Sequence, residues 1–158
     1  MDRFVSNFTL RLDAKGRVSI PASFRSVLSR DGFVGLYCYP ALDQPAVDAG
    51  GHALLAEIEN LVTRLPPYSG EREEFQVALY GRSETVTIDS EGRVVLPDAL
   101  KSHAGITDAV AFVGLGHKFQ IWEPQRFTAH LAKATATVRR LSKRLGFERP
   151  ASDDGARE

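Results

Sequence analysis

Two short stretches of the chain, far apart in the sequence, alternate apolar and polar residues. The first contains Phe8, Leu10 and Leu12, and the second contains Val86 and Ile88. A period of two predicts a β-strand with one buried face. Each stretch runs into the pattern D-x-x-G, which predicts a tight turn, because aspartate bonds the backbone N–H groups ahead of it and glycine accepts a positive φ.

A second short strand and a helix are predicted after each turn. The strands cover residues 17–20 and 93–96. Pro21 and Pro97 come next, and proline favours the first position of a helix because the N–H group that it lacks would have no partner there. The first helix continues through the apolar residues to Leu28, and Gly105 ends the second. The unit is strand, turn, strand and short helix, and it occurs twice.

The two units align without a gap at a constant offset of 76 residues. Residues 7–25 read NFTLRLDAKGRVSIPASFR, and residues 83–101 read SETVTIDSEGRVVLPDALK. Six aligned positions are identical: Thr9 and Thr85, Asp13 and Asp89, Gly16 and Gly92, Arg17 and Arg93, Val18 and Val94, Pro21 and Pro97. Average residue usage would give about one identity by chance. We interpret the similarity as an internal duplication.

The pattern in the rest of the chain is coarser. Residues 33–39 and 109–121 form apolar, strand-like runs, broken by Gly114 and Gly116. Residues 40–51, rich in Pro, Gly and Asp, are predicted as a loop. Apolar residues at a helical spacing predict a helix over 53–65, which ends before Pro66. From Pro124 onward, apolar residues spaced alternately four and three apart predict a long helix with a heptad-like seam. The segment after Pro150 is expected to be disordered.

Charge is segregated along the 158 residues, although the net charge is zero. Residues 1–30 carry +4, residues 31–75 carry −6, residues 76–124 carry −2 and residues 125–158 carry +4. A net charge of zero counts against bulk electrostatic binding of nucleic acid, but both ends of the chain are basic. The hydrophobic fraction of 43% is that of a globular protein.

Composition and motifs count against several classes of protein. No apolar run approaches the about 20 residues that span a bilayer, and the N-terminal segment lacks the apolar core of a signal peptide, so we expect a soluble, cytoplasmic protein without a membrane partner. Cys38 is the single cysteine and lies in an apolar run, so we expect it to be buried rather than to form a disulfide or a metal cluster. The four histidines lack the spacing of metal ligands, and no nucleophile elbow or phosphate-binding fingerprint occurs. We expect no metal, no cofactor and no enzymatic activity.

The sequence DAKGRVSIP near the N-terminus, with a second D-x-x-G-R-x-x-L-P about half the chain later, resembles the MraZ family, and the resemblance covers residues 1–147. It implies a mainly β fold with helices (α+β), namely an internally duplicated, pseudo-twofold AbrB-like swapped-hairpin β-barrel plus a C-terminal helix. It also implies ring-shaped homo-oligomers that bind double-stranded DNA. These would act as nucleoid-associated transcriptional regulators on repeated elements upstream of the division and cell-wall gene cluster, including the protein's own promoter. The domains expected are residues 1–75, residues 76–147 and a disordered tail over 148–158.

The two turns are the parts expected to contact DNA, because a unit too short to close its own core must share one, and turn tips project from the shared barrel. Lys15 and Arg17 flank Gly16, so the backbone can approach DNA while two cations meet phosphates or base edges. Lys15 corresponds to Glu91, so the first turn carries +1 and the second −1. Because Glu91 would repel phosphate, the first turn is favoured as the reader. The predicted DNA-binding residues are Lys15, Arg17, Arg93, Arg25 and Arg11, and the predicted turn-forming residues are Asp13, Gly16, Asp89 and Gly92.

Other interpretations of these residues stay open. Arg17 and Arg93 could be strand-edge residues paired to a carboxylate. The basic cluster at 139–144 is typical of a solvated helix face near a helix C-terminus. The alternative to DNA binding is a ring-forming interaction protein whose basic turns bind an acidic protein partner.

Overall fold

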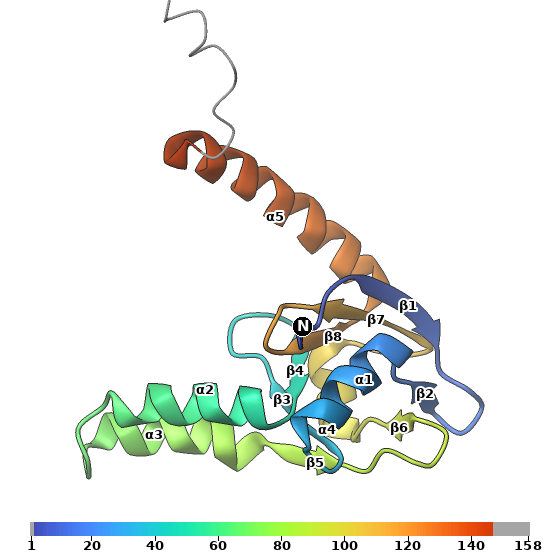
Figure 1. The fold of residues 1–158 in the computed structure, drawn as a ribbon, viewed down its shortest axis with the longest axis horizontal. Helices are drawn as coiled ribbons and strands as arrows, with labels where there is room; N and C mark the ends of the chain where they lie inside the picture. Colours follow the sequence, from blue (N-terminus) through green and yellow to red (C-terminus); the bar gives the residue numbers. More distant parts are fainter. Residues whose placement is uncertain (1, 147–158) are drawn as a thin grey trace, which may run out of the picture. The chain divides into compact units, whose positions relative to one another are not determined.

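The computed structural model describes residues 2–146, and the chain divides into two compact units, one up to Pro124 and one from Gln125 onward (Figure 1). The strands are β1 (Asn7–Arg11), β2 (Arg17–Ser19), β3 (Leu36–Pro40), β4 (Ala46–Gly50), β5 (Glu84–Val86), β6 (Arg93–Val95), β7 (Ala109–Gly114) and β8 (Phe119–Trp122). The helices are α1 (Ala22–Asp31), α2 (His52–Thr63), α3 (Gly70–Leu79), α4 (Asp98–Ala104) and α5 (Pro124–Leu145), with a short 3-10 helix at Tyr80–Arg82. The described part of the chain is therefore of mixed α and β structure, and every strand pair among these elements is antiparallel.

Two sheets form the first unit. The larger sheet has six strands in the order β1-β7-β8-β4-β3-β5, and the smaller one pairs β2 with β6. The outermost strands of the large sheet each pair with a strand from the other half of the chain. Strand β1 pairs with β7, and β5 pairs with β3. Neither half of the chain can therefore complete its own sheet, which ties the folding of the two halves together.

The order of elements recurs along the chain. Strand, strand, helix, strand, strand, helix describes β1 to α2 and again β5 to α5, with α3 and the 3-10 helix standing between the two series. The strand pairings are related in the same way. Leu10 pairs with Val110 and Val86 pairs with Leu36, while Val18 pairs with Val94 at the centre of the small sheet. Equivalent strands of the two series therefore occupy equivalent places in the sheets.

The main hydrophobic core lies on one face of the six-stranded sheet, under α1, α4 and the small sheet. Phe24 of α1 packs its ring against Phe4 and Phe119, with centroids 5.3 and 4.8 Å apart. Val18 and Val94 of the small sheet and Leu100 of α4 are also buried in this core. Aromatic side chains bury large areas, so this cluster is the main attachment of α1 to the sheet. The apolar residues of the two predicted strand–turn–strand–helix units therefore attach these units to the large sheet.

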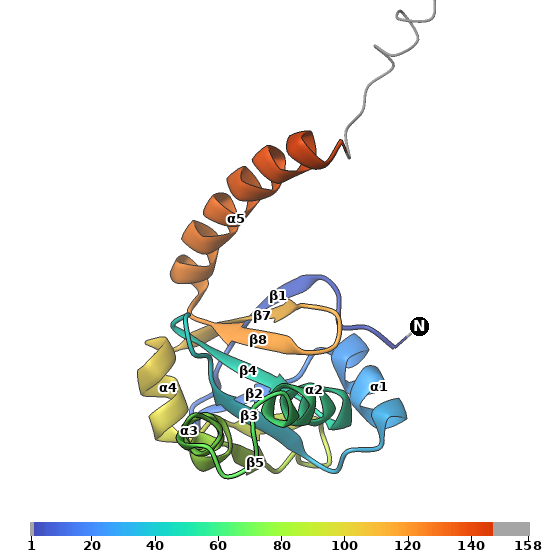
Figure 2. The same cartoon turned by 90° about the vertical axis from the view of Figure 1, so that its left-hand side faces the viewer.

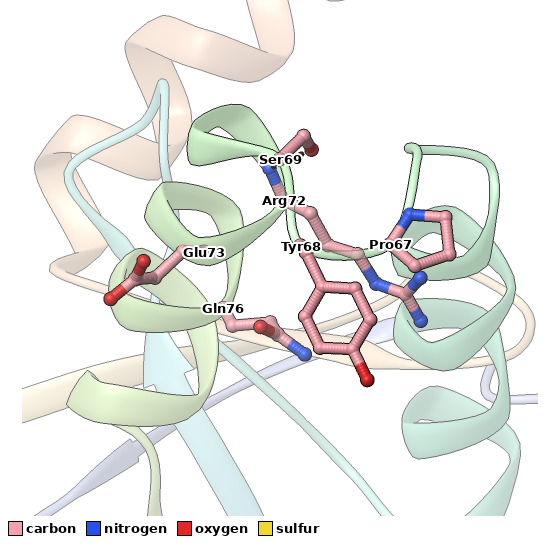
Figure 3. A pocket seen from close by; sticks show the side chains of 6 residues that line it. All are labelled: Pro67, Tyr68, Ser69, Arg72, Glu73 and Gln76. Atoms are coloured by element: carbon pink, nitrogen blue, oxygen red, sulfur yellow. Dashed lines mark hydrogen bonds between the residues drawn. The ribbon is translucent and has the colours of Figure 1, made fainter.

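The other face of the sheet carries α2 and α3, which lie side by side as a helical hairpin (Figures 1 and 2). A second core joins them to β3 and contains Tyr37, Tyr39, Leu54, Ile58, Val62 and Leu79. At the outer tip, Pro67, Tyr68, Ser69, Arg72, Glu73 and Gln76 line a hollow of about 410 Å³ (Figure 3). The Tyr68 side chain is fully exposed there. The hairpin is therefore anchored by its inner part and exposed at its tip.

Local chemistry explains where the helices begin and end. Gly32 and Gly105 follow α1 and α4 with φ of 81° and 69°, and the N–H group of each bonds the last helical carbonyls. The Asp31 carboxylate accepts hydrogen bonds from the backbone N–H groups of His52 (2.6 Å) and Ala53 (3.2 Å) at the start of α2. Ser69 caps α3 by accepting from Arg72 N at 3.1 Å.

One expectation from the sequence is corrected. Residues 40–51 are not a loop throughout, because Ala46–Gly50 forms the buried strand β4. Its Asp48 is buried and accepts hydrogen bonds from Lys118 Nζ (3.1 Å) and Gln120 Nε2 (2.8 Å), which satisfies a residue unusual in a central strand. The predicted break in the apolar run 109–121 at Gly114 and Gly116 is confirmed, because the turn after Gly114 separates β7 from β8.

The second unit contains α5, the predicted long helix, which is confirmed over Pro124–Leu145. Ser142 is buried in it, and its hydroxyl donates to the Val138 carbonyl at 2.6 Å. The predicted disordered tail at 148–158 lies outside the described residues. Within residues 2–146, no helix is both long enough and apolar enough to cross a membrane.

Candidate nucleic-acid interface

The first D-x-x-G sequence forms a closed three-residue loop between β1 and β2. Gly16 N donates to the Asp13 carbonyl at 2.9 Å, and Asp13 N donates to the Arg17 carbonyl at 2.8 Å. Gly16 has φ of 79°, in the left-handed region that side chains with a Cβ disfavour. Beyond the loop the two strands diverge, since β1 enters the large sheet and β2 pairs with β6. The turn is thus a rigid corner and not the end of a long hairpin.

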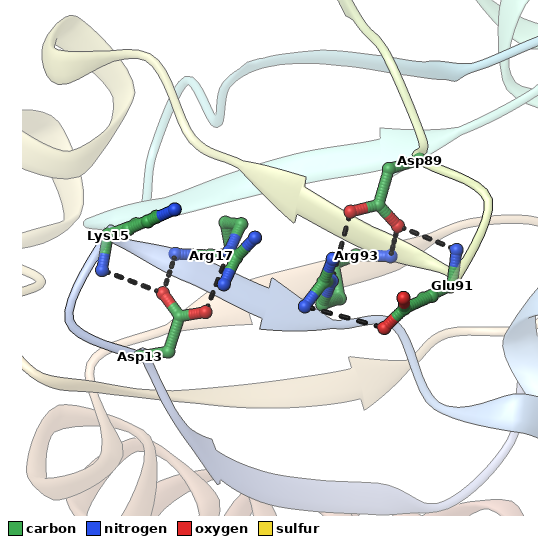
Figure 4. Close-up of polar contacts among 6 residues, drawn as sticks. All are labelled: Asp13, Lys15, Arg17, Asp89, Glu91 and Arg93. Carbon is green, nitrogen blue, oxygen red and sulfur yellow. Dashed lines mark hydrogen bonds and ion pairs between the residues drawn. The ribbon is translucent and has the colours of Figure 1, made fainter.

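The Asp13 carboxylate organises this turn and also holds an arginine (Figure 4). Its Oδ1 accepts hydrogen bonds from Lys15 N (2.9 Å) and Arg17 N (2.8 Å), and its Oδ2 accepts from Arg17 Nε (2.7 Å). The hydrogen bond from the Arg17 backbone contributes most to holding the pKa of Asp13 below its ordinary value, followed by the bond from the Arg17 side chain. Asp13 therefore stays ionised at neutral pH and fixes the Nε side of the Arg17 guanidinium.

The second turn repeats this geometry. Asp89 accepts from Glu91 N, Arg93 N and Arg93 Nε, each at 2.9 Å, and Gly92 has φ of 81°. The hydrogen bond from the Arg93 backbone is the first cause of the lowered pKa of Asp89. The predicted turn-forming residues therefore all lie in the two tight turns.

The two turns differ in how their arginines are paired. Arg93 Nη1 lies 3.5 Å from Glu91 Oε1, so Arg93 contacts two carboxylates. Among residues 2–146, the only ion-pair partner of Arg17 is Asp13. The Lys15 side chain, at the position equivalent to Glu91, is exposed. The first turn consequently presents uncompensated positive charge, whereas the second turn neutralises its arginine internally.

The small sheet brings the two turns into one antiparallel ribbon. Arg17 pairs with Val95, Val18 with Val94, and Ser19 with Arg93. Val18 and Val94 point into the core, so the alternation of a strand places Arg17 and Arg93 on the opposite, outer face. Figure 4 shows both arginines between the two turns, which lie at opposite ends of the ribbon. The ribbon thus offers one face with two guanidinium groups and a turn at each end.

The remaining predicted DNA-binding residues lie at other places around this ribbon. Arg25 on α1 donates from Nε to the Ile20 carbonyl at 3.0 Å and packs on the second turn, where a Cβ at Gly92 would lie 2.6 Å from its Cδ. Arg11, at the end of β1, forms an ion pair with Asp108 at 3.8 Å, and both side chains are mostly exposed. Arg25 therefore accompanies the second turn, and Arg11 lies two residues before the first.

Sequence reasoning did not anticipate the contact of Arg25 with Gly92. The two residues are 67 positions apart, and no local pattern connects α1 to the second turn. It also did not identify Ser19 and Val95 as members of the exposed ribbon face, although both are exposed. Among the described residues, no group of three His, Cys, Asp or Glu side chains is arranged to hold a metal ion.

Comparison with known proteins places this architecture in a family. A family model described as "MraZ protein, putative antitoxin-like" matches residues 79–145. A protein of Xanthobacter autotrophicus named "Transcriptional regulator MraZ" is 66% identical over 146 residues, which cover 92% of this chain and 93% of the relative. Relatives of the same name from Beijerinckia indica and Rickettsia bellii are 59% and 40% identical, covering 100% and 85% of this chain and 100% and 87% of the relatives.

These relatives match both halves of the chain and not only the segment that the family model covers. Identity of 66% over nearly the whole length leaves no room for a different fold family. The chain therefore belongs to the MraZ family, a family of transcriptional regulators and not of enzymes.

Proposed function

We propose that this chain regulates transcription by binding DNA in a sequence-specific way through the ribbon formed by β2 and β6. The observation that carries the proposal is Arg17, held by Asp13 at an exposed turn and without a second carboxylate among the described residues. Arginine makes paired hydrogen bonds to the O6 and N7 atoms of guanine, or to phosphate, which lysine cannot match. Arg17 is therefore the main base-reading residue in this proposal.

The two-stranded form of the ribbon supports this role. The major groove of B-DNA admits a two-stranded β-ribbon, and each base pair displays a distinct pattern of donors and acceptors there. Arg17 and Arg93 share the outer face of the ribbon, and Ser19 adds a hydroxyl beside them. Lys15 at the loop tip is suited to a phosphate contact, which adds affinity without sequence information.

The second turn has a lesser part in the proposal. Glu91 would repel phosphate, and its ion pair with Arg93 competes with any base contact of that arginine. Arg25 lies against this turn and restores some positive charge to it. We assign Arg25 and Arg11 to phosphate contacts and Arg93 to a weaker contact than that of Arg17.

We further propose that the two halves arose by duplication of one strand–turn–strand–helix unit and form a pseudo-twofold swapped-hairpin barrel of the AbrB-like type. The recurring order of elements and the related strand pairings support this. In this proposal residues 1–75 and 76–147 are the two repeats, and they exchange edge strands because neither can close a core alone.

Self-assembly completes the proposal. The chain has zero net charge and few candidate phosphate contacts, so one copy would bind DNA weakly. A ring-shaped homo-oligomer would present several first turns, and their contributions combine through effective concentration on repeated DNA elements. The family resemblance supports elements upstream of the division and cell-wall gene cluster, including the protein's own promoter, as sites and the nucleoid as location.

A gel shift with DNA from the region upstream of the protein's own gene, against scrambled DNA of equal composition, tests the proposal. We expect the upstream DNA to bind at lower protein concentration, and higher salt to weaken binding to both DNAs. Equal binding to the two DNAs, or none to either, would contradict it and favour the alternative, an acidic protein partner for the basic turns.

A further inference from the structure

Helix α5 carries a stripe of apolar side chains that are partly or largely exposed to solvent in the described part of the chain. Leu131, Ala134, Val138, Leu141 and Leu145 recur at intervals of three and four and so lie on one face of the helix. Val138 is 60% exposed and Leu145 is 80% exposed. The helix contains six Lys and Arg residues and no Asp or Glu, and Arg144 lies at the border of the stripe. Its exposed surface is thus apolar along one line and basic elsewhere.

The α2–α3 hairpin carries a surface of opposite charge. Between it and the neighbouring strands is a groove of about 370 Å³ whose apolar lining includes Leu42, Ile58, Leu61, Phe75 and Leu79. Leu42 and Leu61 are exposed, while Ile58 and Leu79 form a buried floor. Asp43, Asp48 and Glu57 line it together with Lys118. Lys118 pairs with Asp48 and His117 contacts Glu57, so among the described residues only Asp43 of the three has no ion-pair partner. The two helices together contain five Glu and one Arg. The groove is thus apolar at its base and offers the carboxylate of Asp43, on a hairpin whose helices are acidic overall.

The two surfaces complement one another in length as well as in charge. The stripe from Leu131 to Leu145 spans about 21 Å at 1.5 Å per residue. Helix α2 has 12 residues and is therefore about 18 Å long. An amphipathic helix that lays its apolar face into a groove between helices is a common mode of protein recognition. Opposite charges at the borders fix the direction in which such a helix lies.

Helices α2 and α5 follow opposite ends of the central strand pair, β4 and β8. Ala46 pairs with Trp122, and Ala49 pairs with Phe119. Helix α2 follows the Ala49 end of β4, whereas α5 follows the Trp122 end of β8. Because the two complementary surfaces are different parts of one chain, a contact between copies through them is head-to-tail, and such contacts close into rings or extend into filaments.

We propose that α5 of one copy docks, through the stripe Leu131–Leu145, into the acid-lined groove of the α2–α3 hairpin of a second copy. This inference rests on the proposed self-assembly and names the surfaces that bring it about. In each contact the leucine and valine side chains of the stripe cover Leu42 and Leu61, and Arg144 faces the carboxylate of Asp43. Each chain then docks its own α5 on one neighbour and accepts α5 of another neighbour in its groove.

A matched pair of variants tests the docking by light scattering without DNA. Val138→Asp places a charge in the middle of the stripe, and we expect the dissociation constant of the assembly to rise by about 30-fold or more. Ala136→Asp adds the same charge at an exposed position on the opposite face of α5 and should assemble as the unchanged protein does. An assembly that survives Val138→Asp, or that Ala136→Asp weakens equally, would overturn the proposal, as would an unchanged protein that is a monomer at micromolar concentration.

A charge exchange between two chains tests the occupant of the groove. Arg144→Glu in α5 and Asp43→Lys in the groove should each weaken assembly alone, because like charges then face each other. A mixture of the two variants should recover assembly, since the helix of one chain meets the groove of the other with opposite charges. No recovery in the mixture, with both variants melting like the unchanged protein by circular dichroism, would contradict the proposed contact.

These measurements separate this inference from the proposed DNA contact. Arg17→Ala lies outside both surfaces and should assemble normally whether or not it binds DNA. Loss of assembly in Val138→Asp supports the docking even if the protein shows no preference for its own upstream DNA. Intact assembly in Val138→Asp removes the docking and leaves the contact of the first turn with DNA unaffected.

Discussion

Exchanging the charges of the two turns reveals how much each turn contributes to DNA binding. Lys15 and Glu91 occupy equivalent positions, so Lys15→Glu gives the first turn the charges of the second, and Glu91→Lys does the reverse. Glu91 is suited to this test because its side chain is 70% exposed and its backbone N–H, not its carboxylate, bonds Asp89. Lys15 likewise contributes only its backbone N–H to the turn. Neither change should disturb the loop.

The magnitude follows from the number of phosphate contacts. Each contact adds about 0.9 to the slope of log affinity against log salt concentration, so raising salt from about 50 to about 200 mM weakens binding about 3.5-fold per contact. Lys15→Glu removes one contact per engaged first turn and should lower the salt dependence by that factor for each turn. Glu91→Lys frees Arg93 from its carboxylate at 3.5 Å and adds a cation, so it should strengthen non-specific binding if the second turn faces DNA.

Fluorescence anisotropy with labelled upstream DNA at three salt concentrations measures both slopes. Arg64→Glu, at the exposed end of α2, changes the net charge as Lys15→Glu does and serves as the control. Binding by Lys15→Glu with the affinity and slope of the unchanged protein would refute the role of the first turn. If Arg64→Glu weakened DNA binding as much as Lys15→Glu, the change in net charge alone would explain the effect. If Glu91→Lys left DNA binding unchanged, the second turn would not face DNA.

Three further predictions concern the turns and the core. Gly16→Ala should cost about 1–2 kcal/mol in urea unfolding because of its φ of 79°, and Gly92→Ala should cost more because its Cβ would also displace Arg25; equal costs would contradict that contact. Burial raises the pKa of the Cys38 thiol to about 12, so it should resist thiol reagents at pH 8 until the protein unfolds, and rapid labelling of the native protein would be inconsistent with this. The pKa of Asp13 is lowered in the folded protein, so ionised Asp13 contributes its full stabilisation above pH 3.8, and this contribution is lost as the pH falls through the lower pKa of the folded state. A titration of Asp13 by NMR with its midpoint at or above pH 3.8 would show that the turn does not stabilise the ionised carboxylate.

The parts of the fold that local chemistry determines could be predicted from the sequence. The D-x-x-G turns, the helix starts after Pro21 and Pro97 and the αL cap at Gly105 depend on residues within a few positions of each other. The long helix from Pro124 was also predictable, because its apolar spacing extends from Phe127 to Leu145, about five turns.

The parts that depend on distant partners could not be predicted. Strand β4 has small residues and a central Asp48, and its polar partners Lys118 and Gln120 come about 70 positions later in the chain. Helix α3 is rich in Glu and has one fully buried residue, Leu79, so its apolar signal is weak. In both cases tertiary contacts outweigh the local pattern.

The candidate site also combines features set by neighbouring residues with features set by distant ones. One open interpretation of the sequence is that Arg17 pairs with a carboxylate. In the structure this carboxylate is that of Asp13, four residues away. The pairing of Arg17 with the carboxylate is compatible with DNA contact, since Asp13 engages the Nε side of the guanidinium. The packing of Arg25 on Gly92 joins the two halves of the chain and gave no signal in either sequence segment.

The central claim is that Arg17 reads a guanine, and Arg17→Lys tests it most directly. The substitution keeps the charge but removes the paired hydrogen bonds, so the ratio of affinities for the upstream DNA and for the same DNA with its guanines replaced should fall. Titration of both proteins on both DNAs gives this ratio, and a circular dichroism melt checks the fold. We predict a loss of discrimination equivalent to about 1–3 kcal/mol per engaged turn with an unchanged melt. Discrimination equal to that of the unchanged protein would contradict the account.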